Sequence, residues 1–101
     1  MKIKIDNKEI NLIICNNFSK RLIGNMFTKN TKNLIFNKCN SIHTFFMRKK
    51  IDVLMFDKNK KLLKTYKNLK PWKIILPKKN VYYVVELPEG TIKNNDRIKL
   101  I

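Results

Sequence analysis

The residues of this sequence that could support catalysis are few, and they gather around a single histidine. His43 is the only histidine of the chain, and histidine is the usual acid or base at neutral pH. Ser41 would share a strand face with His43, but at roughly 6–7 Å, which is too far for a direct hydrogen bond. Cys15 and Cys39 could reach His43 only through a tertiary contact. The sequence therefore shows no complete set of nucleophile, base and orienting group.

Two carboxylates lie inside segments that are predicted to be strands, because their apolar residues alternate with polar ones or form a continuous run. Asp52 stands in IDVLMFD and Glu86 in VVELPEGT. A buried carboxylate must be paired or hydrogen-bonded, so we expect Asp52 to bind Arg48, His43 or a run of backbone N–H groups. A structural role is favoured for Asp52. The alternative is an enzyme of unknown class centred on His43 and Asp52, and the spacing of Asp52 and Glu86 does not indicate paired-carboxylate chemistry.

No metal site and no cofactor are predicted. The candidate ligands Cys15, Cys39, His43 and Asp52 contain no pair at the close spacing typical of zinc sites. Cys15 ends the string LIIC and Cys39 the string FNKC, and two cysteines in a core-forming domain favour two reduced, buried thiols. A single disulfide between them stays open.

Aromatic residues offer a different kind of site, one for binding. Trp72 is the only tryptophan and could anchor a partner, although packing in the core is the commoner role. Tyr66, Tyr82 and Tyr83 could join it in a patch flanked by lysines, of the kind that stacks bases or binds proteins. The predicted ligand-facing residues of such a binding module are His43, Met47, Arg48, Asp52 and Trp72.

The formal net charge of +16 indicates an anionic partner or a compositional bias. Lysine, asparagine and isoleucine, which A/T-rich codons encode, supply 20, 14 and 14 of the 101 residues, and only three residues are arginine. Since arginine is the residue suited to bidentate phosphate and guanine contacts, specific nucleic-acid recognition is not favoured. Weak, salt-sensitive binding of a polyanion remains an alternative. Its predicted contacts are Lys49, Lys50, Lys60, Lys61, Lys78 and Lys79, together with Trp72 and Tyr82.

Period-2 patterns place these residues on short strands. We expect strands over 2–5, 9–15, 34–36, 42–47, 51–56, 61–66, 72–76, 81–87 and 97–101. Turn residues at 6–8 and 57–60 predict a hairpin at each of these two places. The continuous apolar run 51–56 is typical of a strand buried on both faces, and Pro71 and Pro77 should keep 72–76 short or at an edge. Asn16 or Asn17 could cap a short helix over 18–23 that Gly24 ends. The prediction is one all-β domain over 1–101, a small closed or nearly closed barrel of seven to nine short strands with one or two helical turns.

Three strings carry a resemblance to a known family. They are IHTFFMRKKIDVLMFD (42–57), NLKPW (68–72) and VVELPEGT (84–91), preceded by SKRLIGNM (19–26). Together they resemble the domain of unknown function 192 family, in which Lys50 usually is proline, Asn25 leucine and Asn95 glycine. The resemblance implies no established activity, and it suggests a partner in pilus or secretion machinery.

The apolar runs of the sequence indicate where the protein is located. The N-terminus lacks the apolar core of a signal peptide, and no apolar run approaches the roughly 18 residues that span a bilayer. We therefore expect a cytoplasmic protein. The predicted function is a non-catalytic binding or accessory module for a protein partner, with the polyanion binder and the His43–Asp52 enzyme as alternatives.

Overall fold

The computed structural model describes residues 1–17, 24–26 and 28–101, and strands are the only regular elements within them. These residues contain no helix long and apolar enough to cross a membrane. The strands are β1 (Lys2–Ile5), β2 (Lys8–Asn11), β3 (Ile13–Ile14), β4 (Leu34–Asn37), β5 (Ile42–His43), β6 (Ile51–Phe56), β7 (Leu62–Leu69), β8 (Ile74–Ile75), β9 (Tyr83–Pro88) and β10 (Ile98–Leu100). The all-β prediction is confirmed for this part of the chain.

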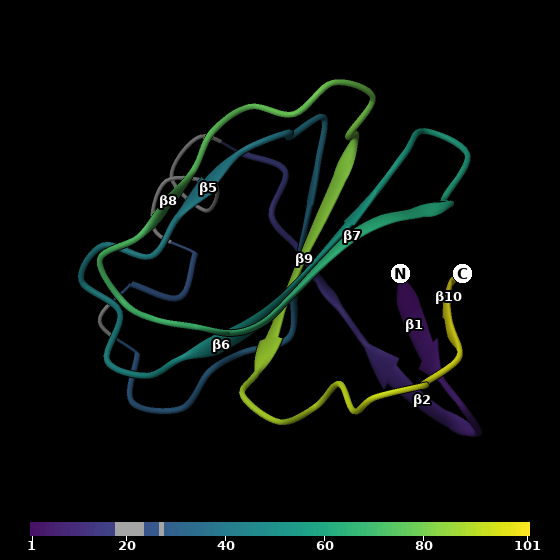
Figure 1. Cartoon of the computed structure of the whole chain (residues 1–101), viewed down its shortest axis with the longest axis horizontal. Coiled ribbons are helices and arrows are strands. Elements are labelled where there is room, and N and C mark those ends of the chain that lie inside the picture. The colour runs from purple at the N-terminus through teal and green to yellow at the C-terminus, as the bar shows by residue number, and fades with distance from the viewer. Residues whose placement is uncertain (18–23, 27) are drawn as a thin grey trace.

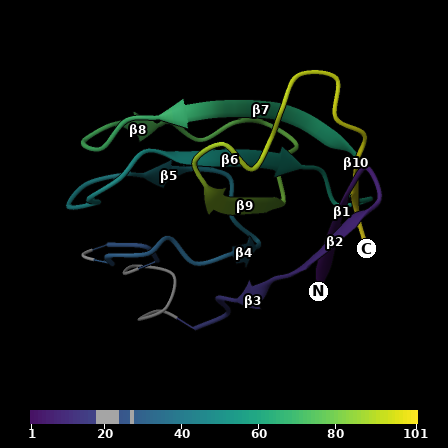
Figure 2. The ribbon, with the colours of Figure 1, turned by 90° about the horizontal axis from the view of Figure 1, so that it is seen from below.

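The strands form three sheets rather than one closed surface. The largest has the order β3-β4-β9-β6-β7, and Figure 2 shows these strands one below the other with β7 at one edge. A three-stranded sheet has the order β10-β1-β2, which brings the two chain ends together (Figure 1). β5 and β8 form a separate pair. The predicted barrel is thus not confirmed, because the five-stranded sheet ends at β3 and β7.

Protein covers both faces of the five-stranded sheet. Alternate residues along β6 and β9 pack into two clusters, with Leu54 and Val85 in one and Val53 and Val84 in the other. The first cluster includes Ile3 and other residues of the three-stranded sheet, and the second includes residues of β5 and β8. All six residues of β6 are buried. The prediction that 51–56 is buried on both faces is confirmed.

The N-terminal hairpin explains how two of the sheets are joined. β1 and β2 pair antiparallel around the turn at Asp6 and Asn7, as predicted. The second strand does not run on to residue 15, because the chain changes sheets at the buried Leu12. Beyond it, β3 pairs parallel with β4 in the five-stranded sheet.

The segment 42–47 differs most from its prediction. Only Ile42–His43 is a strand, and the chain then turns, with the Met47 N–H donating to the Thr44 carbonyl at 3.3 Å. Phe46 has a left-handed φ of 62°. His43, Phe45 and Met47 therefore do not share one face as a continuous strand would place them.

Two other predictions concern local structure. The turn at 57–60 is confirmed, since the Asp57 carboxylate accepts hydrogen bonds from the Asn59 and Lys61 N–H groups, both at 2.9 Å. β8 is as short as its flanking prolines require. The predicted helix over 18–23 lies outside the described residues.

Substitution in β6 should test the importance of its two-sided burial. Leu54→Ala removes a side chain that is 0% exposed, and we expect it to lower the free energy of unfolding by roughly 2–5 kcal/mol. Leu63→Ala, at an exposed position of β7, is the matched control and should cost less than about 1 kcal/mol. Urea denaturation measures both, and equal losses would contradict this account of the core.

Candidate functional site

Thr44 ties together two loops that are distant in sequence. Its side chain is fully buried; Oγ1 donates to the Lys70 carbonyl at 2.7 Å and accepts from the Lys73 N–H at 2.8 Å. The Thr44 N–H donates to the Lys73 carbonyl at 2.8 Å, and its own carbonyl accepts from the Trp72 N–H at 2.9 Å. These four bonds hold the segment that follows β5 against the segment that precedes β8.

Both loops contain an aromatic residue in an unusual backbone conformation. Phe46 and Trp72 have φ values of 62° and 65°, a region that bulky residues seldom occupy. Such conformations cost about 1–3 kcal/mol each and persist where the surrounding structure imposes them. The Thr44 carbonyl accepts hydrogen bonds from the Met47 N–H, next to Phe46, and from the Trp72 N–H, so it holds the backbone at both places.

The two loops present a continuous group of rings, which we call the aromatic surface: His43, Phe45, Phe46 and Trp72. The ring centroids of His43 and Phe45 lie 5.0 Å apart in a stacked arrangement, and those of Phe45 and Trp72 lie 5.9 Å apart. Phe46 meets Trp72 edge to face at 4.7 Å. Trp72 is 60% exposed and Phe46 46%. Large rings held together yet open to solvent are typical of a binding surface rather than of a core.

Aliphatic side chains extend the aromatic surface along β8. Ile74 pairs with His43 across the β5–β8 ladder. Ile74 and Leu76 are 61% and 66% exposed. The apolar area therefore continues beyond the rings.

The structure separates the five predicted ligand-facing residues. His43 and Trp72 belong to the aromatic surface, and Phe45 lies between their rings. Arg48 is exposed on the same loop as Phe46. Met47 and Asp52 are buried in the core, so neither offers its side chain to solvent.

Asp52 is held by backbone groups from two separate segments. Its Oδ1 accepts from the Asn68 N–H at 3.0 Å and its Oδ2 from the Ile92 N–H at 2.9 Å. Asn68 has a φ of 55° at the irregular pairing of β6 with β7. Of the three partners expected for this carboxylate, the backbone N–H groups are the ones observed. Asp52 thereby fastens the loop after β9 to the end of β7.

Glu86 is a second buried carboxylate, and a side chain binds it. Its cross-strand neighbours on β4 and β6 are Leu34 and Val53, and its Oε1 accepts from the Asn25 amide at 2.9 Å. Burial raises the pKa of the Glu86 carboxyl to about 7, and the hydrogen bond from Asn25 opposes that rise. The Asn25 amide also accepts from the Lys32 N–H and donates to the Lys32 carbonyl. The pair thus links the segment before β4 to the central sheet.

Gly24 stands where a side chain would crowd this pair. Its φ is +49°, and a Cβ atom there would lie 3.1 Å from Phe36 Cζ and 3.7 Å from Glu86 Oε1. A left-handed φ and the nearby ring both favour glycine at this position.

The other predicted features are placed as follows. Cys15 and Cys39 do not form a disulfide. Cys15 is buried as predicted, whereas Cys39 is only half-buried. Lys60 and Lys61 lie at the end of the turn between β6 and β7, and Lys78 and Lys79 lie between β8 and β9. A hydrogen bond from the Tyr82 N–H to the Phe56 carbonyl joins the start of β9 to the end of β6. Lys49 and Lys50 lie on the loop before β6, where Lys50 forms an ion pair with Glu89 at 4.0 Å.

Sequence reasoning missed Phe45, Phe46 and Thr44 as parts of the site. The strand pattern assigned them to alternating faces of one ladder, so nothing placed their side chains together. One signal could have found them. The sequence has aromatic residues at 45–46 and, after Pro71, at position 72, and each place adjoins a strand of the β5–β8 ladder. In the sequence, Asn25 stands out only as a departure from the family pattern. Its bond to Glu86 joins residues 61 positions apart, which no local pattern indicates.

Comparison with known proteins places this arrangement in a family. Residues 1–99 match the family model DUF192, described as "Uncharacterized ACR". A UPF0127 protein of Pyrococcus furiosus is 39% identical over 94 residues, which cover 85% of this chain and 80% of that protein. A UPF0127 protein of Pyrococcus horikoshii is 40% identical over 83 residues, which cover 76% of this chain and 71% of that protein.

Two solved structures have a similar fold. One is a protein of unknown function from Novosphingobium aromaticivorans, with a TM-score of 0.75 at 12% identity over 98% of this chain and 84% of that chain. The other is described as a putative transcription regulator from Sinorhizobium meliloti, with a TM-score of 0.73 at 17% identity over 96% of this chain and 90% of that chain. At these identities the likeness shows the fold alone.

Replacing Asp52 should destabilise the protein through its backbone partners. Asp52→Asn keeps the size of the side chain but leaves only one oxygen for two N–H donors. We expect a loss of roughly 1–3 kcal/mol in the free energy of unfolding, because a buried donor is left unsatisfied. Hydrogen exchange should show the Ile92 or Asn68 amide losing protection first. Unchanged stability and exchange would contradict this role.

Glu86 should make stability depend on pH. Its folded pKa of about 7 lies above the ordinary value of 4.5, so the folded state binds the proton more tightly than the unfolded state. The contribution of this group to stability is therefore fully present below pH 4.5 and is lost as the pH rises to about 7. Glu86→Gln should match the wild type in acid and exceed its stability by roughly 2–3 kcal/mol above pH 7.

The measurement is urea denaturation of both proteins across this pH range. Glu89→Gln, which neutralises a half-exposed carboxylate near the end of the same strand, is the matched control and should keep the wild-type pH profile. A Glu86→Gln protein with the wild-type pH dependence would show that Glu86 does not cause it.

Proposed function

The chain belongs to the DUF192 family, and we propose that it is a non-catalytic binding module whose aromatic surface docks an acidic protein partner. The observation that carries this proposal is the exposure of Phe46 and Trp72 on loops that the buried Thr44 holds together. Aromatic residues, tryptophan above all, supply a large share of binding energy at protein interfaces.

Pre-organisation supports docking at this surface. The left-handed backbone at Phe46 and Trp72 and the bonds of Thr44 place the rings before any partner arrives. A surface that is ordered in the free protein loses less entropy on binding than a mobile one. The rings can therefore contribute most of their burial energy to the complex.

The charges of the loops that carry the aromatic surface support an acidic partner. Its two loops, residues 43–50 and 70–79, contain seven cationic residues and no aspartate or glutamate. These residues are Arg48, Lys49, Lys50, Lys70, Lys73, Lys78 and Lys79. One of them, Lys50, is paired with Glu89 from outside the two loops. A carboxylate-rich partner would complement this rim and be steered to it at low salt. A second copy of the same chain would be repelled.

The apolar extension favours a protein over a nucleic acid. Ile74 and Leu76 give the surface an aliphatic part, which matches the apolar core and polar rim of a protein interface. Nucleic acids bind through stacking and phosphate contacts and make little use of exposed aliphatic groups. Components of secretion or pilus machinery are the first partners to test, following the family resemblance. The description of one structural neighbour as a putative transcription regulator is a reason to include DNA in the test.

Substitution of Trp72 should separate docking from unspecific attraction. The tagged full chain, Trp72→Ala and Leu63→Ala are used to capture proteins from lysate of the native organism, and each candidate is then purified and titrated. We expect one acidic protein that binds the wild type and Leu63→Ala equally and binds Trp72→Ala at least roughly 30-fold more weakly, since loss of a hot-spot residue costs about 2 kcal/mol or more. Leu63 is exposed on β7 and so matches the loss of apolar area.

Nucleic acid is tested in parallel through the fluorescence of Trp72, the only tryptophan. Single- and double-stranded DNA and RNA are added at low salt to the wild type and to Lys70→Gln, which lacks one rim charge. Quenching that saturates, in the absence of any Trp72-dependent protein partner, would overturn the proposal in favour of nucleic-acid binding. Affinity for the purified partner that does not fall as salt increases would contradict its acidic character.

A further inference from the structure

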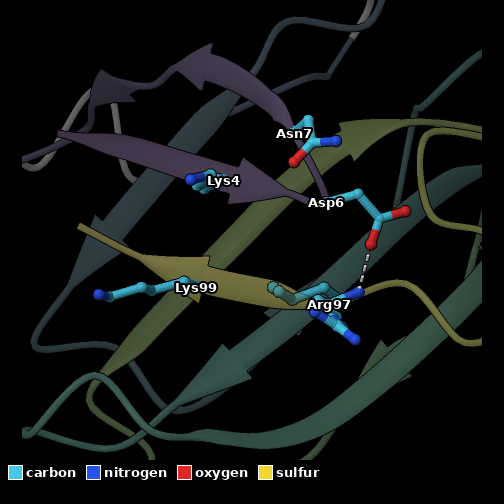
Figure 3. A pocket seen from close by; sticks show the side chains of 6 residues that line it. Lys4, Asp6, Asn7, Arg97 and Lys99 are labelled. Atoms are coloured by element: carbon cyan, nitrogen blue, oxygen red, sulfur yellow. Dashed lines mark hydrogen bonds between the residues drawn. The ribbon is translucent and has the colours of Figure 1, made fainter.

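An open groove lies over the paired strands β1 and β10, where the exposed Lys4 and Lys99 project from their sheet. Its volume is about 530 Å³, and its lining includes Lys4, Asp6, Asn7, Arg97 and Lys99. Figure 3 shows Lys4 and Lys99 on adjacent strands, with Arg97 and Asp6 at the end where the strands meet the turn. The groove is separate from the loops of the aromatic surface, which follow β5 and precede β8.

The pairing register puts two like charges opposite one another in this groove. Lys4 is the direct cross-strand partner of Lys99, while Ile3 and Leu100, the pair beside them, are buried. Opposed side chains on adjacent strands have Cβ atoms about 4.5–5.5 Å apart, and like charges in that arrangement are destabilising. Glu9 faces Lys4 from β2. Lys99 lies on the edge strand of the sheet and has no such acidic neighbour there.

Asp6, the carboxylate of the groove, is committed to the backbone. Its Oδ1 accepts from the Arg97 N–H at 2.8 Å, and its own N–H donates to the Arg97 carbonyl at 2.8 Å. The dashed line in Figure 3 marks the first of these bonds. This reciprocal pair fixes Arg97 at the rim of the groove. Among the described residues, Lys50 and Glu89 form the one ion pair. The guanidinium of Arg97 therefore forms no ion pair with a carboxylate of these residues.

The lining therefore carries three cations against one carboxylate. Figure 3 shows Lys99 and Arg97 extending toward opposite ends of β10, so the cations that can share one small anion are Lys4 and Lys99. Lysine ammonium groups act as mobile point charges, and an arginine guanidinium can bind two oxygens of one oxyanion. An anion placed between Lys4 and Lys99 would replace their repulsion with two attractions. The Asn7 amide could add a neutral donor.

We propose that Lys4 and Lys99 form a binding site for a phosphate-sized oxyanion, either inorganic phosphate or the phosphate group of a monoester or lipid, and that Arg97, which lines the same groove, adds to its positive field. The site is independent of the proposed docking of a protein at the aromatic surface. Either proposal can fail without the other.

The test is a ¹H–¹⁵N NMR titration of the full chain with inorganic phosphate, with sodium chloride at equal ionic strength as the reference. Lys99→Gln removes one cation of the groove, and Lys58→Gln removes one exposed cation of the β6–β7 turn. We expect saturable shifts confined to the residues around the groove, unchanged in Lys58→Gln and with a Kd about tenfold higher in Lys99→Gln, since a charge-assisted hydrogen bond is lost. Small shifts spread over all lysines, equal in both variants, would overturn the proposal.

Thermal unfolding gives a second readout that does not need a ligand. Without phosphate and at low salt, Lys99→Gln should have a higher Tm than Lys58→Gln, because it alone relieves the repulsion with Lys4. With phosphate, the Tm of the wild type and of Lys58→Gln should rise by the same amount, and that of Lys99→Gln should rise clearly less. A phosphate-induced rise in all three proteins would show general anion screening and would count against the site.

Further arms identify the source of the phosphate group. Glycerol phosphate and vesicles of phosphatidate in phosphatidylcholine replace inorganic phosphate in the same titration. Binding of glycerol phosphate that depends on Lys99 assigns the site to a soluble monoester, and Lys99-dependent binding of vesicles alone assigns it to a lipid headgroup. Vesicle binding that is equal in both variants would contradict the proposed site.

Discussion

The structure depends on the burial of β6 and β9 on both faces. These two strands lie in the middle of the five-stranded sheet, and apolar residues of each alternate between two separate clusters. Neither cluster could form without the other segments that cover the sheet, so the terminal hairpin and the β5–β8 pair are held by the same constraint. Burial of apolar area is the dominant stabilising term in such a fold.

That constraint governs the few polar groups inside. Asp52 and Glu86 stand on the central strands and cannot reach water, so each needs a partner from elsewhere in the chain. Asp52 finds two backbone N–H groups, whereas Glu86 has the Asn25 amide and an elevated pKa. The rise in the pKa of Glu86 has a physical origin, since an apolar environment favours the neutral form of a carboxyl. Both carboxylates fasten peripheral segments to the core.

The surfaces suited to binding lie outside this core. The aromatic surface occupies the segments that follow β5 and precede β8, at one end of this antiparallel pair, and the groove of Lys4 and Lys99 occupies an edge of the terminal sheet. A rigid scaffold with side chains presented on loops and edges is a common basis for recognition, because these positions can vary without loss of the core. The bonds of Thr44 show how one buried hydroxyl can order such a surface.

Local pattern in the sequence determined the strands, the turn at Asp57 and the two-sided burial of 51–56, because alternation and turn chemistry act between near neighbours. It did not determine where Ile42–Met47 bends, since that bend depends on Thr44 bonding to a loop about 26 residues away. Nor did it decide that three sheets form instead of a barrel, that Trp72 faces solvent, or that Glu86 meets Asn25. Those outcomes depend on contacts between distant segments, and period and composition carry no information about which segments meet.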